Sequence, residues 1–150
     1  MLIDALLAWL HFAAIFALIV PLVAEAILLR PDMPAATVRR LANYDRLYLA
    51  CALAVIATGL LRLFYGAKGA SFYLPNPWFH AKMGLFVVIA LLSLRPTVAF
   101  LKWRRQARML PGFVPTNTEI KRTRRWVMIQ VHLFGFLPLF AALMARGIGL

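Results

Sequence analysis

The chain has 150 residues, of which 63% are hydrophobic, and a formal net charge of +12. Its apolar content exceeds that of soluble globular domains, in which about half of the residues are apolar. The length fits one domain, and the single Cys51 excludes an intramolecular disulfide framework and cysteine-clustered zinc or iron–sulfur sites. The composition therefore indicates one integral membrane domain.

Four apolar runs predict four membrane-spanning helices. In chain order they cover about residues 2–29, 47–65, 79–101 and 126–144. Each is close to the roughly 20 residues that an α-helix needs to cross a hydrocarbon core. Because the connections are short, successive helices should be antiparallel. The sequence predicts an all-α integral membrane protein, an up-down four-helix transmembrane bundle that forms a single domain over residues 1–150. Thr116, Asn117 and Thr118 are candidate caps for the last long helix.

Lysine and arginine are divided unevenly between the two sides of this bundle. Four arginines lie between the first two spans, and eight cations lie between the third and fourth, whereas the opposite loop carries only Lys68. The positive-inside rule then places both termini on the non-cytoplasmic side. The charge excess reflects topology, so nucleic-acid binding is not expected. The expected location is the lipid bilayer of a bacterial inner membrane.

Polar residues recur along one face of each of the first two spans. Asp4, His11, Leu18 and Glu25 are seven residues apart, which is nearly two helical turns, so they share a face. Phe12, Phe16, Ile19 and Leu22 should fall mostly to its sides. The second span repeats the pattern with Asp45, Tyr48, Cys51, Val55, Thr58, Arg62 and Tyr65. Ionisable residues in membrane spans are costly and usually face a site in the bundle interior.

Two groups of these residues are expected at different depths. The outer third should gather Asp4, His11, Arg62, His80, Lys82 and Arg146. Its cations outnumber its carboxylate, which suits an anionic ligand. In the cytoplasmic third, Glu25 has arginines such as Arg95 within plausible reach, so it is either a structural ion pair or a proton relay. His132, roughly 10 Å or more deeper than His11 by helix rise, forms either a helix–helix hydrogen bond or a second ligand site.

The outer group favours haem. Imidazole is a common axial ligand, and membrane bundles hold cofactors between facing helices. His11 and His80 lie on parallel spans, but their depths differ by roughly 9 Å. Ligation by His11 alone, with Lys82 and Arg62 holding the propionates, therefore fits better than ligation by both histidines. A divalent metal site is the weaker alternative, because only Asp4 adds a carboxylate there.

Two segments carry a family resemblance. The segments "LLAWLHFAAIFALIV" and "WFHAKMGLFVVIALL" resemble the first and third spans of the HemJ-type protoporphyrinogen IX oxidases. This resemblance implies haem b, oxidation of protoporphyrinogen IX and electron transfer to the respiratory chain, with His11, His80, Lys82 and Arg62 at the matching positions. The continuation "IVPLVAEAILLR" lacks the tyrosine and inner histidine of that family.

Three further segments carry a stronger resemblance, to another family. The segments "PWFHAKM", "SLRPT" and "ALMARGIG" resemble an uncharacterised family of predicted four-span bacterial membrane proteins. Membership of that group implies the fold and leaves the activity open.

The sequence thus predicts a haem-b-binding membrane oxidoreductase or electron carrier, with a tetrapyrrole such as protoporphyrinogen IX as candidate substrate. Lys82 and Arg62 are the candidate catalytic residues, and His11 and His80 the candidate metal ligands. His132 and Arg146 are further candidate cofactor-binding residues.

The alternative is a non-enzymatic accessory or assembly subunit, in which the polar cluster is structural. Gly59, Gly84 and Gly135 would then offer close-packing surfaces to a partner or to a second copy in a homodimer. A quinone or a respiratory-chain protein is the expected redox partner under the haem hypothesis.

Overall fold

The computed structural model describes residues 2–148, and these residues form helices and connecting turns without any strand. The helices are α1 (Leu2–Leu28), α2 (Ala35–Tyr65), α3 (Gly69–Tyr73), α4 (Pro77–Met109), α5 (Asn117–Phe134) and α6 (Leu137–Ala145). Four segments are long and apolar enough to cross a membrane: Leu2–Leu28, Ala35–Tyr65, Pro77–Met109 and Asn117–Ala145. The predicted all-α four-helix transmembrane bundle is confirmed.

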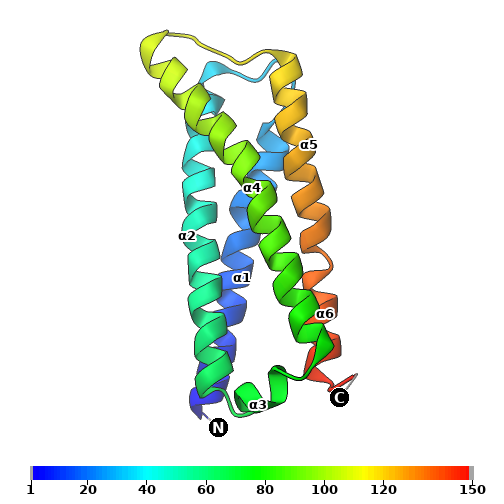
Figure 1. The fold of residues 1–150 in the computed structure, drawn as a ribbon. Coiled ribbons are helices and arrows are strands. Elements are labelled where there is room, and N and C mark those ends of the chain that lie inside the picture. The colour runs from blue at the N-terminus through cyan, green and yellow to red at the C-terminus, as the bar shows by residue number, and fades with distance from the viewer. Residues whose placement is uncertain (1, 149–150) are drawn as a thin grey trace.

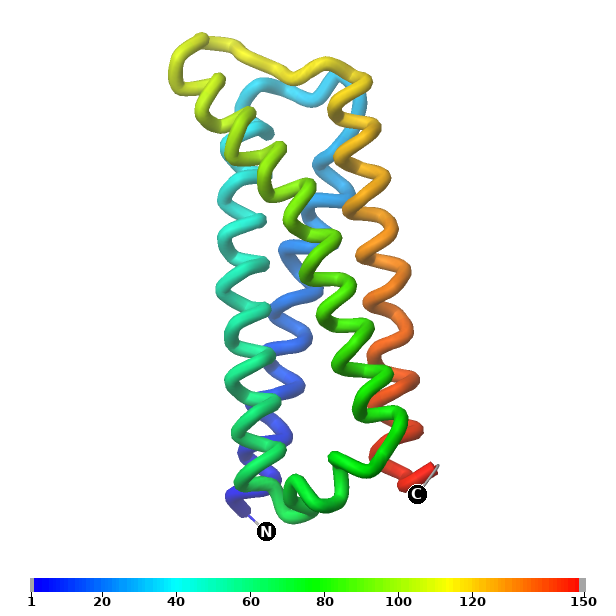
Figure 2. Tube along the Cα trace, in the orientation of Figure 1, coloured from blue at the N-terminus to red at the C-terminus, as the bar shows by residue number. Residues whose placement is uncertain are grey.

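The bundle has two distinct ends (Figures 1 and 2). We call the end that holds α3 the α3 end; the first turn of α1 and the last turn of α6 also lie there. The opposite end, which we call the basic end, holds the loops 29–34 and 110–116. Helices α1 and α2 pack along each other, whereas α4 crosses from α2 at the basic end to α6 at the α3 end.

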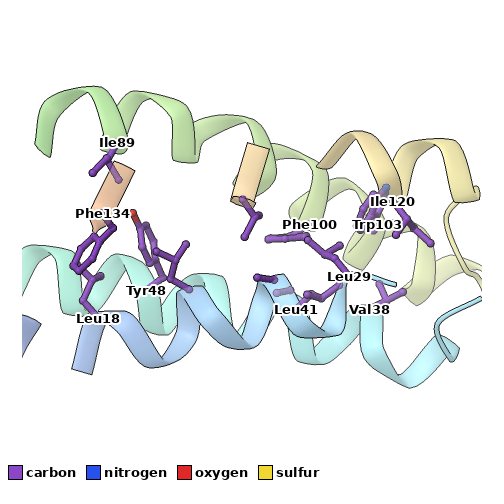
Figure 3. Close-up of a cluster of buried hydrophobic side chains, with 14 of the residues drawn as sticks. Leu18, Leu29, Val38, Leu41, Tyr48, Ile89, Phe100, Trp103, Ile120 and Phe134 are labelled. Carbon is purple, nitrogen blue, oxygen red and sulfur yellow. The ribbon is translucent and has the colours of Figure 1, made fainter. Parts of the chain in front are cut away.

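Close packing is concentrated in the middle of the bundle and toward the basic end. The buried hydrophobic residues of α1 begin at Leu18, those of α2 end at Tyr48, and those of α4 begin at Ile89. Figure 3 shows these side chains pointing between the helices, together with Phe100 and Trp103, whose rings meet edge to face at 5.7 Å. The half of the bundle nearer to the α3 end has fewer buried side chains, among them His11 and Leu137.

The start of α4 explains the position of His80 and Lys82. Asn76 precedes the helix, and its Oδ1 accepts a hydrogen bond of 2.9 Å from the backbone N–H of Trp78. Pro77 occupies the first helical position, where its missing N–H costs nothing. His80 and Lys82 therefore lie at the beginning of α4, as the sequence predicts.

The last span differs from the sequence prediction because it is not one continuous helix. Helix α5 ends at Phe134 and α6 begins at Leu137, with Gly135 donating its backbone N–H to His132 O at 3.2 Å. Pro138 lies in the first turn of α6, and a proline cannot donate to the preceding turn. The short α3 in the loop after α2 was also not predicted.

The loops at the basic end are fixed by polar caps. Thr116 caps α5: its Oγ1 accepts from Glu119 N–H at 3.3 Å, and Glu119 Oε2 accepts from Thr116 N–H at 3.1 Å. Asn117 links the two loops, since its Oδ1 accepts from Asp32 N–H at 3.1 Å. Of the three candidate caps, Thr116 is therefore the one that is used.

Replacing Thr116 by alanine is expected to lower the free energy of unfolding by about 1 kcal/mol, the usual effect of removing a side-chain cap. Equilibrium unfolding in detergent measures this change. Thr118→Ala is the matched control, because Thr118 lies in the first turn of α5 and is exposed. Equal destabilisation by the two substitutions would contradict the assigned cap.

Candidate functional site

The histidine on α1 is buried and its orientation is fixed. His11 is 5% exposed, and its Nδ1 lies 2.9 Å from Thr58 Oγ1 on α2. Thr58 donates its one hydroxyl hydrogen to its own helix, where Ala54 O is 2.7 Å away. The hydroxyl oxygen is then an acceptor, so His11 Nδ1 carries the hydrogen of this bond. The lone pair of His11 therefore resides on Nε2, the nitrogen that is left free.

A glycine beside Thr58 allows this close approach. A Cβ atom placed on Gly59 would lie 3.3 Å from His11 Cε1, closer than ordinary van der Waals contact. Glycine thus lets the imidazole lie against the backbone of α2. Gly59 was expected to offer a packing surface to a partner protein. In the structure it faces His11 of the same chain instead.

Two cations complete this site. Lys82 and Arg62 act on His11 electrostatically, and Arg62 also acts on Lys82. The Arg62 guanidinium lies 5.8 Å from the centre of the Phe12 ring. Neither cation has a carboxylate partner, since the one ion pair among residues 2–148 joins Lys102 and Glu119. The group of His11, Lys82 and Arg62 therefore carries uncompensated positive charge.

Asp4 does not balance this charge. It is half-buried at the α3 end, and its Oδ1 accepts a hydrogen bond of 2.9 Å from the backbone N–H of Ala67. The Asp4 carboxylate thus binds the turn that follows α2. The sequence predicted Asp4 in the outer group with His11, and it lies at that end of the bundle with a backbone N–H as its partner. The structure confirms that the seven-residue stripe of α1 turns inward, because His11, Leu18 and Glu25 are all buried.

The other candidate ligands lie apart from His11. His80 is exposed, and its Nε2 donates to Leu74 O at 2.8 Å in the loop before α4. His132 is also exposed, and its Nδ1 donates to Met128 O of its own helix at 2.6 Å. The helix–helix hydrogen bond expected of His132 is therefore not formed, because the carbonyl one turn earlier is nearer. Arg146 is exposed just after α6.

A second polar cluster lies among α1, α2 and α4, closer to the basic end. Glu25 and Asp45 are 3% and 7% exposed, and Asp45 lies within electrostatic range of Glu25. Thr97 Oγ1 donates to Asp45 Oδ1 at 2.6 Å. Tyr48, also buried, lies beside both carboxyl groups and beside Ser93 of α4. We call Glu25, Asp45, Tyr48, Ser93 and Thr97 the acidic cluster.

The expected ion pair between Glu25 and an arginine is wrong. Within the described part of the chain, Glu25 forms no salt bridge, and its Oε1 has no hydrogen-bond partner. Arg95 instead stacks on the Trp126 ring, with its guanidinium 4.4 Å from the ring centre. Because Arg95 and Thr97 are two residues apart on a helix, they point to nearly opposite sides. Thr97, which sequence reasoning missed, is the one that reaches the bundle interior.

The described residues contain no group of three or more His, Cys, Asp or Glu side chains that could hold a metal ion. The alternative of a divalent metal site beside Asp4 thus gains no support. His11 remains the one buried histidine of residues 2–148.

Comparison with known proteins gives a family and no activity. No curated protein matches the chain, and no solved structure matches it. A family model described as "Predicted membrane protein (DUF2214)" matches residues 3–149. This finding agrees with the resemblance to predicted four-span membrane proteins, whereas the resemblance to HemJ-type oxidases gains no support from it. The chain belongs to the DUF2214 family of predicted membrane proteins.

Proposed function

We propose that this membrane protein binds haem b through His11 and serves as an electron carrier or oxidoreductase. The observation that carries the proposal is the buried imidazole of His11, whose Nδ1–H is held by Thr58 and whose Nε2 has the free lone pair. Histidines that ligate metals usually donate their other ring N–H to a fixed partner in this way, which sets the tautomer.

The surroundings of His11 suit a tetrapyrrole with acidic substituents. The half of the bundle that contains His11 has few buried hydrophobic residues, Leu137 among them, so apolar side chains there could pack against an apolar ring. Lys82 and Arg62 lie within electrostatic range of His11 and have no carboxylate partner of their own. Propionate groups would supply the missing negative charge. Bound haem would contribute reversible one-electron chemistry.

His11 is the preferred ligand, and His80 is a weaker candidate. The exposed His80 is bonded to Leu74 O, so ligation through both histidines would require this contact to break. Lys82 and Arg62 remain the candidate catalytic residues, because they would border a tetrapyrrole substrate such as protoporphyrinogen IX that approaches the propionate side of the haem. A quinone or a respiratory-chain protein would accept the electrons.

One observation favours the alternative of an accessory subunit. Gly84 on α4 has no atom within 4 Å of where its Cβ would stand, so this stretch of α4 is open to a helix of another protein or of a second copy. Small residues at such places let transmembrane helices approach closely. Under this alternative His11, Lys82 and Arg62 serve only to hold the helices.

The absorption spectrum of the detergent-purified protein tests the proposal. Protein from haem-replete cells is expected to show a Soret band and, after dithionite reduction, the α band of a b-type haem. Colourless protein that also fails to bind added haemin would contradict haem binding and leave the accessory role. Rescue of a strain lacking its own protoporphyrinogen oxidase tests the substrate separately, since a coloured protein that does not rescue would be a cytochrome with another partner.

A further inference from the structure

The acidic cluster contains two carboxyl groups that are largely buried. Glu25 of α1 and Asp45 of α2 are both buried, and they lie close enough to interact electrostatically. These helices pack along each other through most of their length. The two acids are therefore held together by the most extensive helix contact of the fold.

No positive side chain compensates these acids. Among residues 2–148 neither Glu25 nor Asp45 forms a salt bridge. On α4, Arg95 is exposed and stacked on Trp126. From α5, the buried Gln130 is uncharged and donates to Trp126 O of its own helix at 3.2 Å. Arg46, next to Asp45 in the chain, is exposed, and no salt bridge joins it to either acid.

The hydrogen bonds of the cluster are incomplete. Asp45 has one donor, Thr97, at 2.6 Å. Ser93 gives its hydroxyl hydrogen to Ala90 O at 2.7 Å, so it donates to neither acid. Glu25 Oε1 is buried with no partner at all. A buried carboxyl oxygen without a donor is costly, and so are two adjacent carboxylates. A positive group bound at these two acids would therefore stabilise the cluster.

We infer that Glu25 and Asp45 form a binding site for one small, hard cation, either a proton or an alkali-metal ion. The oxygen atoms of Tyr48, Ser93 and Thr97 add neutral ligands or hydrogen-bond partners around the two carboxyl groups. Oxygen donors of this kind suit hard cations, and acids inside membrane bundles are commonly the sites of proton or ion transfer. The inference is independent of haem, because the cluster shares no residue with His11, Lys82 or Arg62.

The first experiment asks whether the cation is a proton. Infrared spectra of the detergent-purified protein are recorded near neutral pH in H2O and in D2O without alkali-metal ions. A proton in the site is expected to give a C=O stretch of a protonated carboxyl group that shifts in D2O and is lost in Glu25→Gln. The matched control is Asp4→Asn, which removes a half-buried carboxylate that is already hydrogen-bonded and should leave the band unchanged.

The second experiment asks whether the cation is an alkali-metal ion. Thermal unfolding is compared in NaCl and in N-methylglucamine chloride of equal ionic strength. A sodium site should raise the unfolding temperature with increasing Na⁺, as a ligand specific to the folded state does. The rise should vanish in Glu25→Gln and in Asp45→Asn, while the Asp4→Asn control retains it.

Either positive result supports the site and identifies its occupant. The inference is overturned if the wild-type protein shows neither a protonated carboxyl band nor a sodium-dependent rise. It is also overturned if either signal persists unchanged in both Glu25→Gln and Asp45→Asn. Both variants replace an acid by its neutral isostere, and the wild-type measurements decide the question even if one variant does not fold.

Discussion

Replacing His11 by alanine is expected to abolish haem binding, so that the purified variant has no Soret band. The reason is that His11 is the buried histidine of the described chain and the one whose Nε2 lone pair is fixed by a hydrogen bond to another helix. Haem content is measured against protein concentration after growth with excess haem precursor. His132→Ala is the matched control, because that exposed histidine bonds only to its own helix.

A variant of Thr58 separates ligation from a general loss of structure. Thr58→Val keeps the shape of the side chain and removes the acceptor of His11 Nδ1–H. Loss of such a partner typically weakens metal binding by about 10- to 100-fold, so haemin titration of this variant should give an intermediate affinity. Wild-type haem content in His11→Ala, or equal loss in His132→Ala, would remove His11 as the ligand.

The helical periodicity of the sequence was sufficient to predict the inward face of α1 and most of that of α2. On α2 the prediction was wrong for Tyr65, which lies at the end of the helix and is 71% exposed. His11, Leu18 and Glu25 are buried as their seven-residue spacing requires. Leu22 was expected beside this face but is 2% exposed, because α1 packs against α5 as well as α2 and so buries a wider face than one stripe. Periodicity gives the direction of a face, and the number of neighbouring helices decides how wide it is.

Hydrogen-bond partners were harder to predict than depth. The sequence placed His80 and Lys82 at the beginning of α4, yet it did not show that His80 would bind Leu74 O. It placed Glu25 near several arginines, but an arginine at a helix surface can reach an aromatic ring, as Arg95 reaches Trp126. A long flexible arginine side chain can contact any of several nearby groups, so spacing in the sequence alone does not identify its partner.

Within the acidic cluster, the sequence predicted some of the buried residues and missed others. Asp45 and Tyr48 belonged to the predicted inward stripe of the second span, and both are buried. Thr97 was missed because the charged Arg95, two residues earlier, was the expected partner of Glu25 on this part of the third span. The signal that could have found Thr97 is its place two residues after Arg95, on the nearly opposite side of α4.

Substituting Gly59 by leucine is expected to reduce the haem content to that of His11→Ala. Even a Cβ at this position would stand 3.3 Å from His11 Cε1, so the remaining atoms of leucine must push the imidazole away from Thr58. Gly59→Ala should have a smaller effect, since a shift of the ring by a few tenths of an ångström relieves its contact. Haem content and haemin affinity of the two variants measure this graded response.

Gly84→Leu is the matched control, because Gly84 lies in a transmembrane helix and has open space where a side chain would begin. Both leucine substitutions favour the helix and add the same apolar surface, so a difference between them reports on the neighbour of Gly59. Retained haem in Gly59→Leu would mean that His11 does not need its place against α2, and the proposed site would be wrong. If both leucine variants lose haem, the loss would be caused by disturbed helix packing in general. Loss in Gly59→Leu alone ties haem binding to the contact between α1 and α2, the contact that orients His11.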